Sequence, residues 1–297
     1  MTHSFLNCTL FAAWLLVSSV QGARAQAVFP TPEAGASAFV DALASNDDAA
    51  MQRVLGSDFR RFIPAQDVNQ DDVYRFLGAW SQGHEIVSEP ASEKKPAIAH
   101  IAVGTSKWTL PIPLVKTQRG WRFDPVAGRD ELMTRRIGRN ERAAMRTSLA
   151  YLDAQRDYRA LTHHYAGRLV SRPGQRDGLY WPAAQGETPS PLGPLAIAMQ
   201  QGNGAPSGGY HGYHYRILAA QGAHPNGGRK DYEQDGVLAD GCALVAWPVS
   251  YGATGVMTFL VNDEGKLVQK NFGPDTTRMV GRLRSFDPDG SWSTAKP

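Results

Sequence analysis

The stretch Val256-Met-Thr-Phe-Leu-Val-Asn-Asp-Glu-Gly-Lys-Leu-Val-Gln-Lys-Asn271 decides the fold class of this 297-residue chain. Two short apolar runs flank Asn262-Asp-Glu-Gly265, a sequence typical of a hairpin connector, so the stretch predicts two antiparallel strands. Two further runs of the same kind come before it. The C-terminal part of the chain therefore predicts four strands, at residues 212–219, 242–249, 256–261 and 266–271.

A helix is predicted ahead of these strands, at residues 141–158, with Asn140 as its N-cap. Its apolar residues recur at helical spacing and define one inward face, which contains Ala144, Met145, Leu149 and Leu152. One helix followed by adjacent strands predicts a layer of helix on sheet. We therefore expect a C-terminal α+β domain, residues 141–297, in which a helix packs on a four-stranded antiparallel meander.

The N-terminal half predicts a second α+β domain, residues 26–128. Helices are expected at residues 32–44, from 46–48 onward and at 69–81, and strands at 97–103, 108–117 and 121–123. Thr31 is the expected cap of the first helix. This order resembles the small cone-shaped domains typified by nuclear transport factor, a likeness of fold alone. Residues 129–140 are expected to form a charged linker with a short helix at 130–137.

The first 25 residues are typical of a signal peptide. An apolar core, Phe11-Ala-Ala-Trp-Leu-Leu-Val17, precedes the small-residue ending Ala23-Arg24-Ala25, which predicts cleavage before Gln26. The alternative is an uncleaved membrane anchor. Cleavage predicts a periplasmic or secreted protein without a stable membrane span. It also removes Cys8 and leaves Cys242 alone in an apolar run, where a core position is favoured over a nucleophile.

Composition narrows the classes of partner and cofactor. Lysine and arginine total 31 against 28 acidic residues, and a net charge of +3 does not indicate a nucleic-acid partner. His211 and His214 lie three residues apart, which places them on opposite faces of a strand and disfavours a shared metal site. No metal and no cofactor is predicted, and the sequence carries no recognisable catalytic motif.

One polar set suggests a binding site at the junction of the two domains. Arginine binds carboxylates through a planar fork, so one hypothesis is that Arg135 or Arg136 holds an anionic ligand at this junction. The favoured interpretation is an internal network in which these arginines pair with Asp124, Asp130, Glu131 or Asp177 and fix the orientation of the domains. The candidate binding residues are Arg135, Arg136, Arg139, Glu141, Asp177, Tyr180 and Trp181. No catalytic residue is predicted.

Several longer motifs point to a family. They are Gly120-Trp-Arg-Phe-Asp124, Arg135-Arg-Ile-Gly-Arg-Asn-Glu141, Asp177-Gly-Leu-Tyr-Trp181, Ser190-Pro-Leu-Gly-Pro194, Gly212-Tyr-His-Tyr-Arg-Ile-Leu218, Ala243-Leu-Val-Ala-Trp-Pro248 and Tyr251-Gly-Ala-Thr-Gly-Val-Met-Thr-Phe259. Together they resemble the bacterial domain-of-unknown-function family 2950 across most of the chain after residue 25. The resemblance implies an exported protein, mostly of Gram-negative origin, and implies no catalytic residues. Cys242 departs from the family, in which a large apolar residue is usual.

The C-terminal half also resembles the globular head of type IV pilins and pseudopilins. The likeness rests on the order of a helix, the Gly212-Tyr-His-Tyr-Arg run, the later strands and an acidic-Gly turn. Pilins begin with a long hydrophobic helix, whereas the helix predicted here is amphipathic and internal. The likeness therefore implies the fold of a pilin head and not assembly into a fibre.

These observations favour a non-enzymatic binding or assembly accessory of the cell envelope. Its partner would be an envelope protein or glycan that the sequence does not identify. The alternative is an envelope hydrolase with Asp177 and Glu141 as acid and base in the interdomain cleft.

Overall fold

The computed structural model describes residues 25–63, 70–93, 95–194, 196–199 and 208–297. The chain divides into two compact units, Met1–Arg129 and Asp130–Pro297. Both contain helices and antiparallel sheet, so the α+β class is confirmed. Residues 1–24 of the predicted signal peptide lie outside the described residues. None of the described helices combines the length and apolar character needed to cross a bilayer.

Helices come first in the N-terminal unit, as predicted. They are α1 (Pro32–Ala44), α2 (Asp48–Leu55), α3 (Phe59–Phe62) and α4 (Gln70–Gln82). The Thr31 hydroxyl accepts the Ala34 N–H at 3.2 Å and caps α1, as predicted. Asp47 caps α2 in the same way, since its carboxylate accepts the Ala50 N–H at 2.9 Å.

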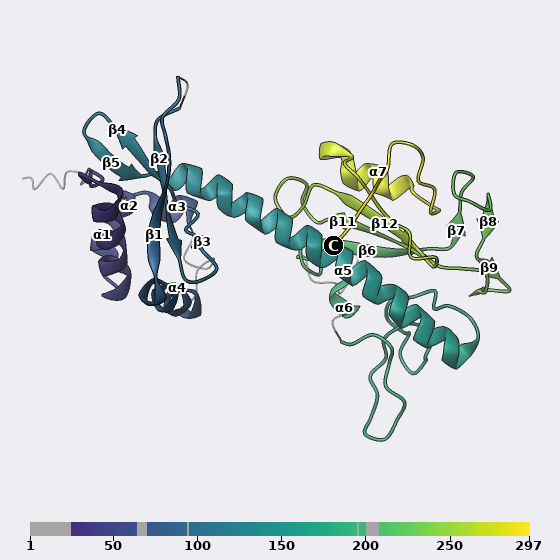
Figure 1. The fold of residues 1–297 in the computed structure, drawn as a ribbon. Helices are drawn as coiled ribbons and strands as arrows, with labels where there is room; N and C mark the ends of the chain where they lie inside the picture. Colours follow the sequence, from purple (N-terminus) through teal and green to yellow (C-terminus); the bar gives the residue numbers. More distant parts are fainter. Residues whose placement is uncertain (1–24, 64–69, 94, 195, 200–207) are drawn as a thin grey trace, which may run out of the picture. The chain divides into compact units, whose positions relative to one another are not determined.

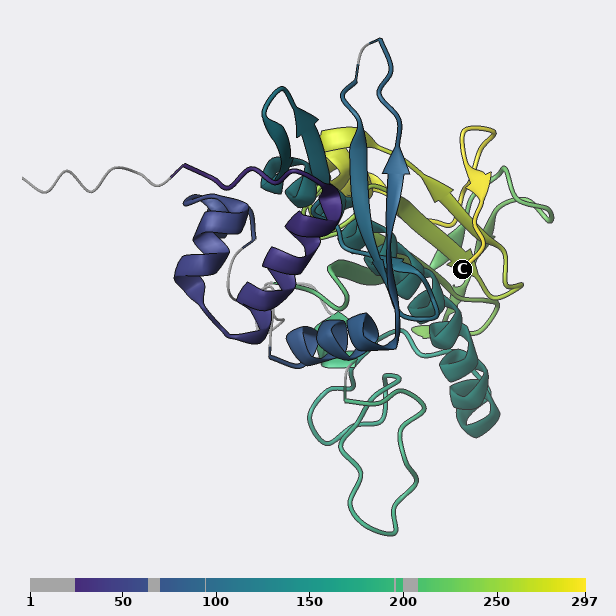
Figure 2. The same cartoon turned by 60° about the vertical axis from the view of Figure 1, so that its left-hand side comes forward.

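The sheet of this unit has five strands among the described residues, whereas the sequence predicts three. One strand was not predicted, and one predicted strand is divided into two. The strands of the sheet are β1 (His84–Glu89), β2 (Ile98–Val103), β3 (Trp108–Thr109), β4 (Leu114–Thr117) and β5 (Gly120–Phe123), in the order β1-β2-β4-β5 with β3 also on β2. The single strand predicted at 108–117 is wrong. Pro111 and Pro113 lack the N–H that a ladder needs, so the run divides into β3 and β4, which both pair with β2. Figure 2 shows the long hairpin of β1 and β2.

One helix stands where the sequence predicts two. Helix α5 runs from Pro125 to Thr162 without a break, so the predicted linker helix and the cap at Asn140 are wrong. The Asp124 carboxylate caps this helix by accepting the N–H groups of Val126 and Ala127, each at 3.1 Å. The Asn140 side chain instead donates from Nδ2 to the Thr254 carbonyl at 2.8 Å.

The C-terminal unit contains the predicted meander. All four predicted strands are present, as β6 (Tyr213–Leu218), β11 (Ala243–Pro248), β12 (Thr258–Asn262) and β13 (Leu267–Lys270), each antiparallel to the next. A fifth strand, β14 (Ser293–Thr294), pairs with β13 at the edge. The sheet order is therefore β14-β13-β12-β11-β6.

Helix α5 packs on this sheet over its second half (Figure 1). Tyr151 is fully buried and donates its hydroxyl to the Ala243 carbonyl of β11 at 3.3 Å. Gln155 is also fully buried, and its amide bonds the Tyr151 hydroxyl and both backbone groups of Ala166. These bonds satisfy the buried polar atoms and fix the helix against the sheet.

Short elements complete the unit. They are α6 (Ala196–Met199), β7 (Ala220–Gln221), β8 (Lys230–Asp231), β9 (Glu233–Gln234), β10 (Val237–Leu238), the 3₁₀ helix η2 (Gly273–Asp275) and α7 (Thr276–Arg282). Arg216 of β6 donates to the carbonyls of Val280 and Leu283 at the end of α7, at 2.7 and 3.0 Å. A guanidinium at this position satisfies carbonyl groups that a helix leaves unpaired at its C-terminus.

Candidate functional site

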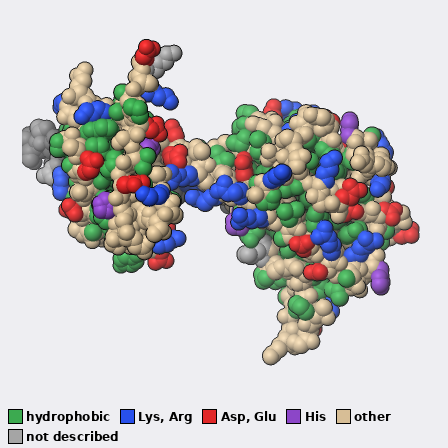
Figure 3. Space-filling model, viewed as in Figure 1, with side chains coloured by type: hydrophobic (Ala, Val, Ile, Leu, Met, Phe, Trp, Pro, Cys, Tyr) green, Lys and Arg blue, Asp and Glu red, His purple; other side chains and the backbone are tan. Residues whose placement is uncertain are grey.

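Four arginines of α5 follow the spacing i, i+4, i+7, i+11. We call them the arginine stripe: Arg135, Arg139, Arg142 and Arg146. With 3.6 residues per turn, they lie within about 60° of one another around the helix axis. A rise of 1.5 Å per residue sets the stripe's length at about 17 Å. Lys and Arg side chains gather along this part of α5 in Figure 3.

The stripe faces solvent because the opposite side of the helix is buried. Ala144, Ser148 and Tyr151 lie on the far side of the helix from the stripe, and each is at most 1% exposed. Arg139, Arg142 and Arg146 are exposed, and the Arg135 side chain is 26% exposed. Packing of α5 against its sheet therefore turns this row of guanidinium groups outward.

Arg135 differs from the other three members in having a close acidic partner. Its Nε lies 2.7 Å from Glu131 Oε1, one helical turn earlier. Among the residues that the structure describes, no acidic side chain pairs with Arg139, Arg142 or Arg146. The interpretation favoured from the sequence, in which arginines pair internally, thus holds for Arg135 through Glu131. It does not extend along the stripe.

Glu141 lies on the same helix but takes a structural role. Its Oε1 accepts the backbone N–H groups of Val256 and Met257 at 2.9 and 3.0 Å. The Tyr213 hydroxyl donates to the Met257 carbonyl at 2.9 Å, which ties the start of β6 to the same segment. Three of the motifs quoted above thus meet at one point, where α5, β6 and the segment before β12 are held together.

Asp177 lies in the loop between α5 and α6 and is held by residues of that loop. Its Oδ2 lies 2.6 Å from Arg172 Nε and 3.5 Å from Arg168 Nε, and its Oδ1 accepts the Arg172 N–H. Burial raises the pKa of Asp177, but the bonds from Arg172 outweigh it and hold the pKa below its usual range. This carboxylate is therefore ionised at neutral pH and neutralised locally.

Tyr180 and Trp181 belong to the same loop. The backbone of Tyr180 bonds Leu169 and Ser171, and the Trp181 indole N–H donates to the Thr188 carbonyl at 3.2 Å. The Trp181 ring is buried, with the Arg176 guanidinium 5.7 Å from its centre. The structure thus brings Asp177, Tyr180 and Trp181 into one loop, while Glu141 is held at the segment before β12. The predicted seam between the two units stays a prediction.

The sequence predicted some of these arginines and missed others. Arg136 and Arg139, which were predicted, are exposed, as a binding role requires. Arg136 is turned about 100° around the helix from Arg135 and is not a member of the stripe. Arg142 and Arg146 were not among the predicted residues. Their spacing from Arg135 and Arg139 was visible in the sequence. The predicted break at Asn140 hid it, because a helical spacing has no meaning across two separate helices.

Cys242 is a core residue, as predicted. It is fully buried, and burial raises the pKa of its thiol to about 12. A thiol in this environment is protonated at neutral pH and is not a nucleophile. The described residues hold no group of three His, Cys, Asp or Glu side chains that could bind a metal ion.

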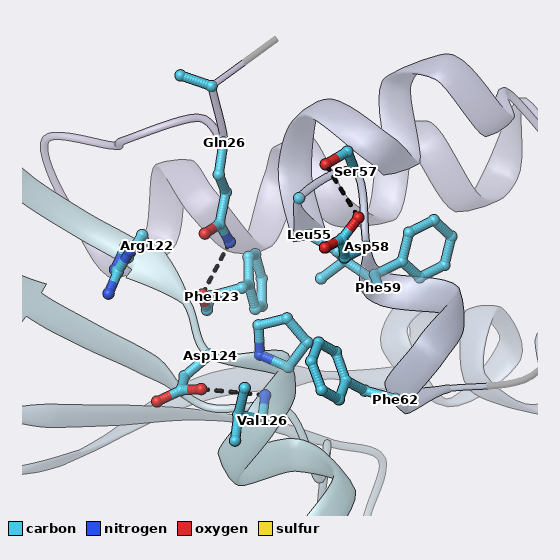
Figure 4. A pocket seen from close by; sticks show the side chains of 13 residues that line it. Gln26, Leu55, Ser57, Asp58, Phe59, Phe62, Arg122, Phe123, Asp124 and Val126 are labelled. Carbon is cyan, nitrogen blue, oxygen red and sulfur yellow. Dashed lines mark hydrogen bonds between the residues drawn. The ribbon is translucent and has the colours of Figure 1, made fainter. Parts of the chain in front are cut away.

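A pocket of about 380 Å³ lies in the N-terminal unit, beside the start of the described chain. Phe62 and Phe123 line it, together with Gln26 and Asp124 (Figure 4). The Gln26 amide donates to the Phe123 carbonyl at 2.8 Å, and Asp124 caps α5. Since both polar side chains fix the path of the chain, this pocket is a weaker candidate than the arginine stripe.

The comparisons agree with the family that the motifs indicate. A family model described as "Protein of unknown function (DUF2950)" matches residues 26–295. The chain therefore belongs to the DUF2950 family. It matches no curated protein and no solved structure. The resemblances to pilin heads and to the cone-shaped domains accordingly stay predictions.

Proposed function

We propose that this protein is an exported component of the bacterial cell envelope that binds an anionic ligand and does not transform it. The observation that carries the proposal is the arginine stripe of α5. A row of exposed guanidinium groups raises the local concentration of anions and binds their oxygens through charge-assisted hydrogen bonds. The predicted leader of residues 1–25 supports export, with Gln26 as the first residue of the mature chain.

The arrangement of carboxylates supports binding over hydrolysis. A glycosidase needs two carboxyl groups that face one substrate across a short gap. Glu141 is engaged by the N–H groups of Val256 and Met257, and Asp177 by Arg168 and Arg172. Asp177 lacks the raised pKa that a general acid needs at neutral pH, because the bonds from Arg172 lower the pKa of this carboxyl. We therefore place both groups in the framework of the protein.

The test compares binding with stability in single variants of two exposed members of the stripe. The Arg139→Ala and Arg142→Ala proteins are incubated with envelope extract, and the anionic components retained are compared with those retained by the wild type. We expect retention to fall while the melting temperature stays within about 1–2 °C, since exposed substitutions change stability little. Lost stability with unchanged retention would show that these arginines are struts, and hydrolysis of retained glycan would favour the enzyme.

A further inference from the structure

We infer that the ligand of the arginine stripe is a chain of closely spaced phosphate groups. This inference rests on the proposed function and names the chemical class of its ligand. The first argument is the geometry of the cations. Their positions along the helix axis differ by about 6, 4.5 and 6 Å, at 1.5 Å per residue. A single small anion can bridge two neighbouring guanidinium groups, whereas a chain with repeated charges can contact all four.

The second argument is the kind of cation. All four members are arginine, and Arg136 beside them is arginine as well. The guanidinium plane presents paired N–H donors that match two oxygens of one phosphate, while the lysine ammonium acts as a point charge. Arg139, Arg142 and Arg146 have no acidic partner among the described residues, so these donors are available to an external ligand.

The third argument is the charge at the two ends of the row. Glu131 lies one turn before Arg135 on the same side of the helix and pairs with it. Asp153 lies two turns beyond Arg146 on that side, with its side chain 74% exposed. The two carboxylates lie about 33 Å apart along the helix axis and bound a row of arginines that is itself about 17 Å long. The stripe is therefore matched to a short run of phosphates and not to an extended anionic surface.

The fourth argument favours a polymer over a lipid bilayer as the carrier of the phosphate groups. A helix that lies on a membrane places large apolar side chains in the interface beside its cationic groups. Beside the stripe, the apolar face of α5 is committed to the core, where Tyr151 and Leu152 are at most 3% exposed. The exposed apolar residues of this helix, Val126, Met133 and Leu161, lie outside the span of the stripe. Since α5 has no exposed large apolar side chain within that span, we assign the phosphates to a soluble or glycan-borne chain.

The experiment titrates the purified protein with fluorescently labelled long-chain inorganic polyphosphate. The test variant is Arg139→Gln/Arg142→Gln/Arg146→Gln. The matched control is Arg156→Gln, an exposed arginine of the same helix that pairs with Asp153 at 2.8 Å. We expect at least about a tenfold loss of affinity in the triple variant and little change in the control. The slope of log affinity against log salt should fall by about one for each arginine removed.

Three further probes separate the possible failures. Orthophosphate tests a single anion, polyglutamate tests a carboxylate chain, and phosphatidylglycerol vesicles test a bilayer. If one of these binds through the stripe as tightly as polyphosphate, the ligand class is wrong and the anion-binding function stands. If no probe binds, or if the triple variant binds every probe like the wild type, both the ligand class and the proposed function are wrong.

Discussion

At the scale of single residues, Glu141 is the side chain on which the C-terminal unit depends most clearly. One carboxylate oxygen accepts two backbone N–H groups, from Val256 and Met257, and so joins α5 to the segment before β12. We expect Glu141→Ala to lower the free energy of unfolding by about 2–4 kcal/mol, because it leaves two donors unpaired. Chemical denaturation of the variant measures the loss.

The control for this variant is Asp153→Ala, on the same helix. Its side chain is 74% exposed and pairs only with Arg156 among the described residues. Exposed ion pairs contribute little, so this variant should unfold within about 0.5 kcal/mol of the wild type. Equal losses of unfolding free energy in both variants would show that the two hydrogen bonds of Glu141 contribute no more to stability than an exposed ion pair.

Cys242 gives a second prediction at this scale, which concerns pH. Burial raises the pKa of its thiol to about 12, from an ordinary value of 9.0. The unfolded chain therefore releases this proton at a lower pH than the folded chain. The contribution of Cys242 to stability is complete below about pH 9 and is lost as the pH rises toward 12. Cys242→Ala should show a smaller loss over this range.

The native thiol should also resist alkylation by iodoacetamide at pH 8 and react only after denaturant is added. The thiolate is the reactive form, and burial both excludes the reagent and keeps the proton on sulfur. Mass spectrometry of the labelled protein measures the extent of reaction. Rapid labelling of the folded protein would contradict a core position for this residue.

At the scale of elements, the continuity of α5 makes a prediction about its two glycines. Gly138 lies inside the helix, and an added Cβ would meet only Arg142 Nη1, at 3.6 Å. Gly138→Ala should therefore stabilise the protein by about 0.5–1 kcal/mol, the difference in helix propensity. Gly128→Ala, in the same helix, is the control for this substitution. Its added Cβ would lie 2.9 Å from Ile112 Cγ1 and 3.1 Å from its Cα.

We thus expect Gly128→Ala to destabilise the protein despite the same gain in propensity, because the backbone of Ile112 must shift. Circular dichroism during thermal unfolding measures both variants. A loss of stability in Gly138→Ala would contradict one continuous helix at this point and would favour the predicted break near Asn140.

The elements that the sequence predicted well are those with a strong local signal. The four strands of the C-terminal meander have apolar runs bounded by turn residues, and each was found. Strand β1 was missed because five of its six residues are exposed, which leaves no apolar pattern. The break in 108–117 was missed although Pro111 and Pro113 mark it, because the flanking apolar residues suggested one run.

Helix α5 shows why the site was only partly predictable. Gly138 and Asn140 are typical of a helix end and a cap, but the side chain of Asn140 bonds Thr254, more than 100 residues away in the sequence. A contact of this range is invisible to local reasoning. The predicted break assigned Arg135, Arg136 and Arg139 to a linker. Arg142 and Arg146 join them only on an unbroken helix.

At the scale of the whole molecule, the proposed export makes a prediction about mass. The protein isolated from its native host should begin at Gln26, since Ala23-Arg24-Ala25 has the form of a cleavage site. Fractionation should recover it from the periplasm or the medium. An intact mass that includes residues 1–25, or recovery from the cytosol, would contradict export and with it the envelope setting of the proposed function.

The central claim is that the arginine stripe binds an anionic chain and contributes little to the stability of the fold. Its most direct test is the change in melting temperature on addition of long-chain polyphosphate. A ligand at 100 times its dissociation constant stabilises a folded protein by about 2.7 kcal/mol. We predict a rise of several degrees for the wild type and none for Arg139→Gln/Arg142→Gln/Arg146→Gln, with equal melting temperatures when no polyphosphate is present. The same rise in both proteins would contradict the claim.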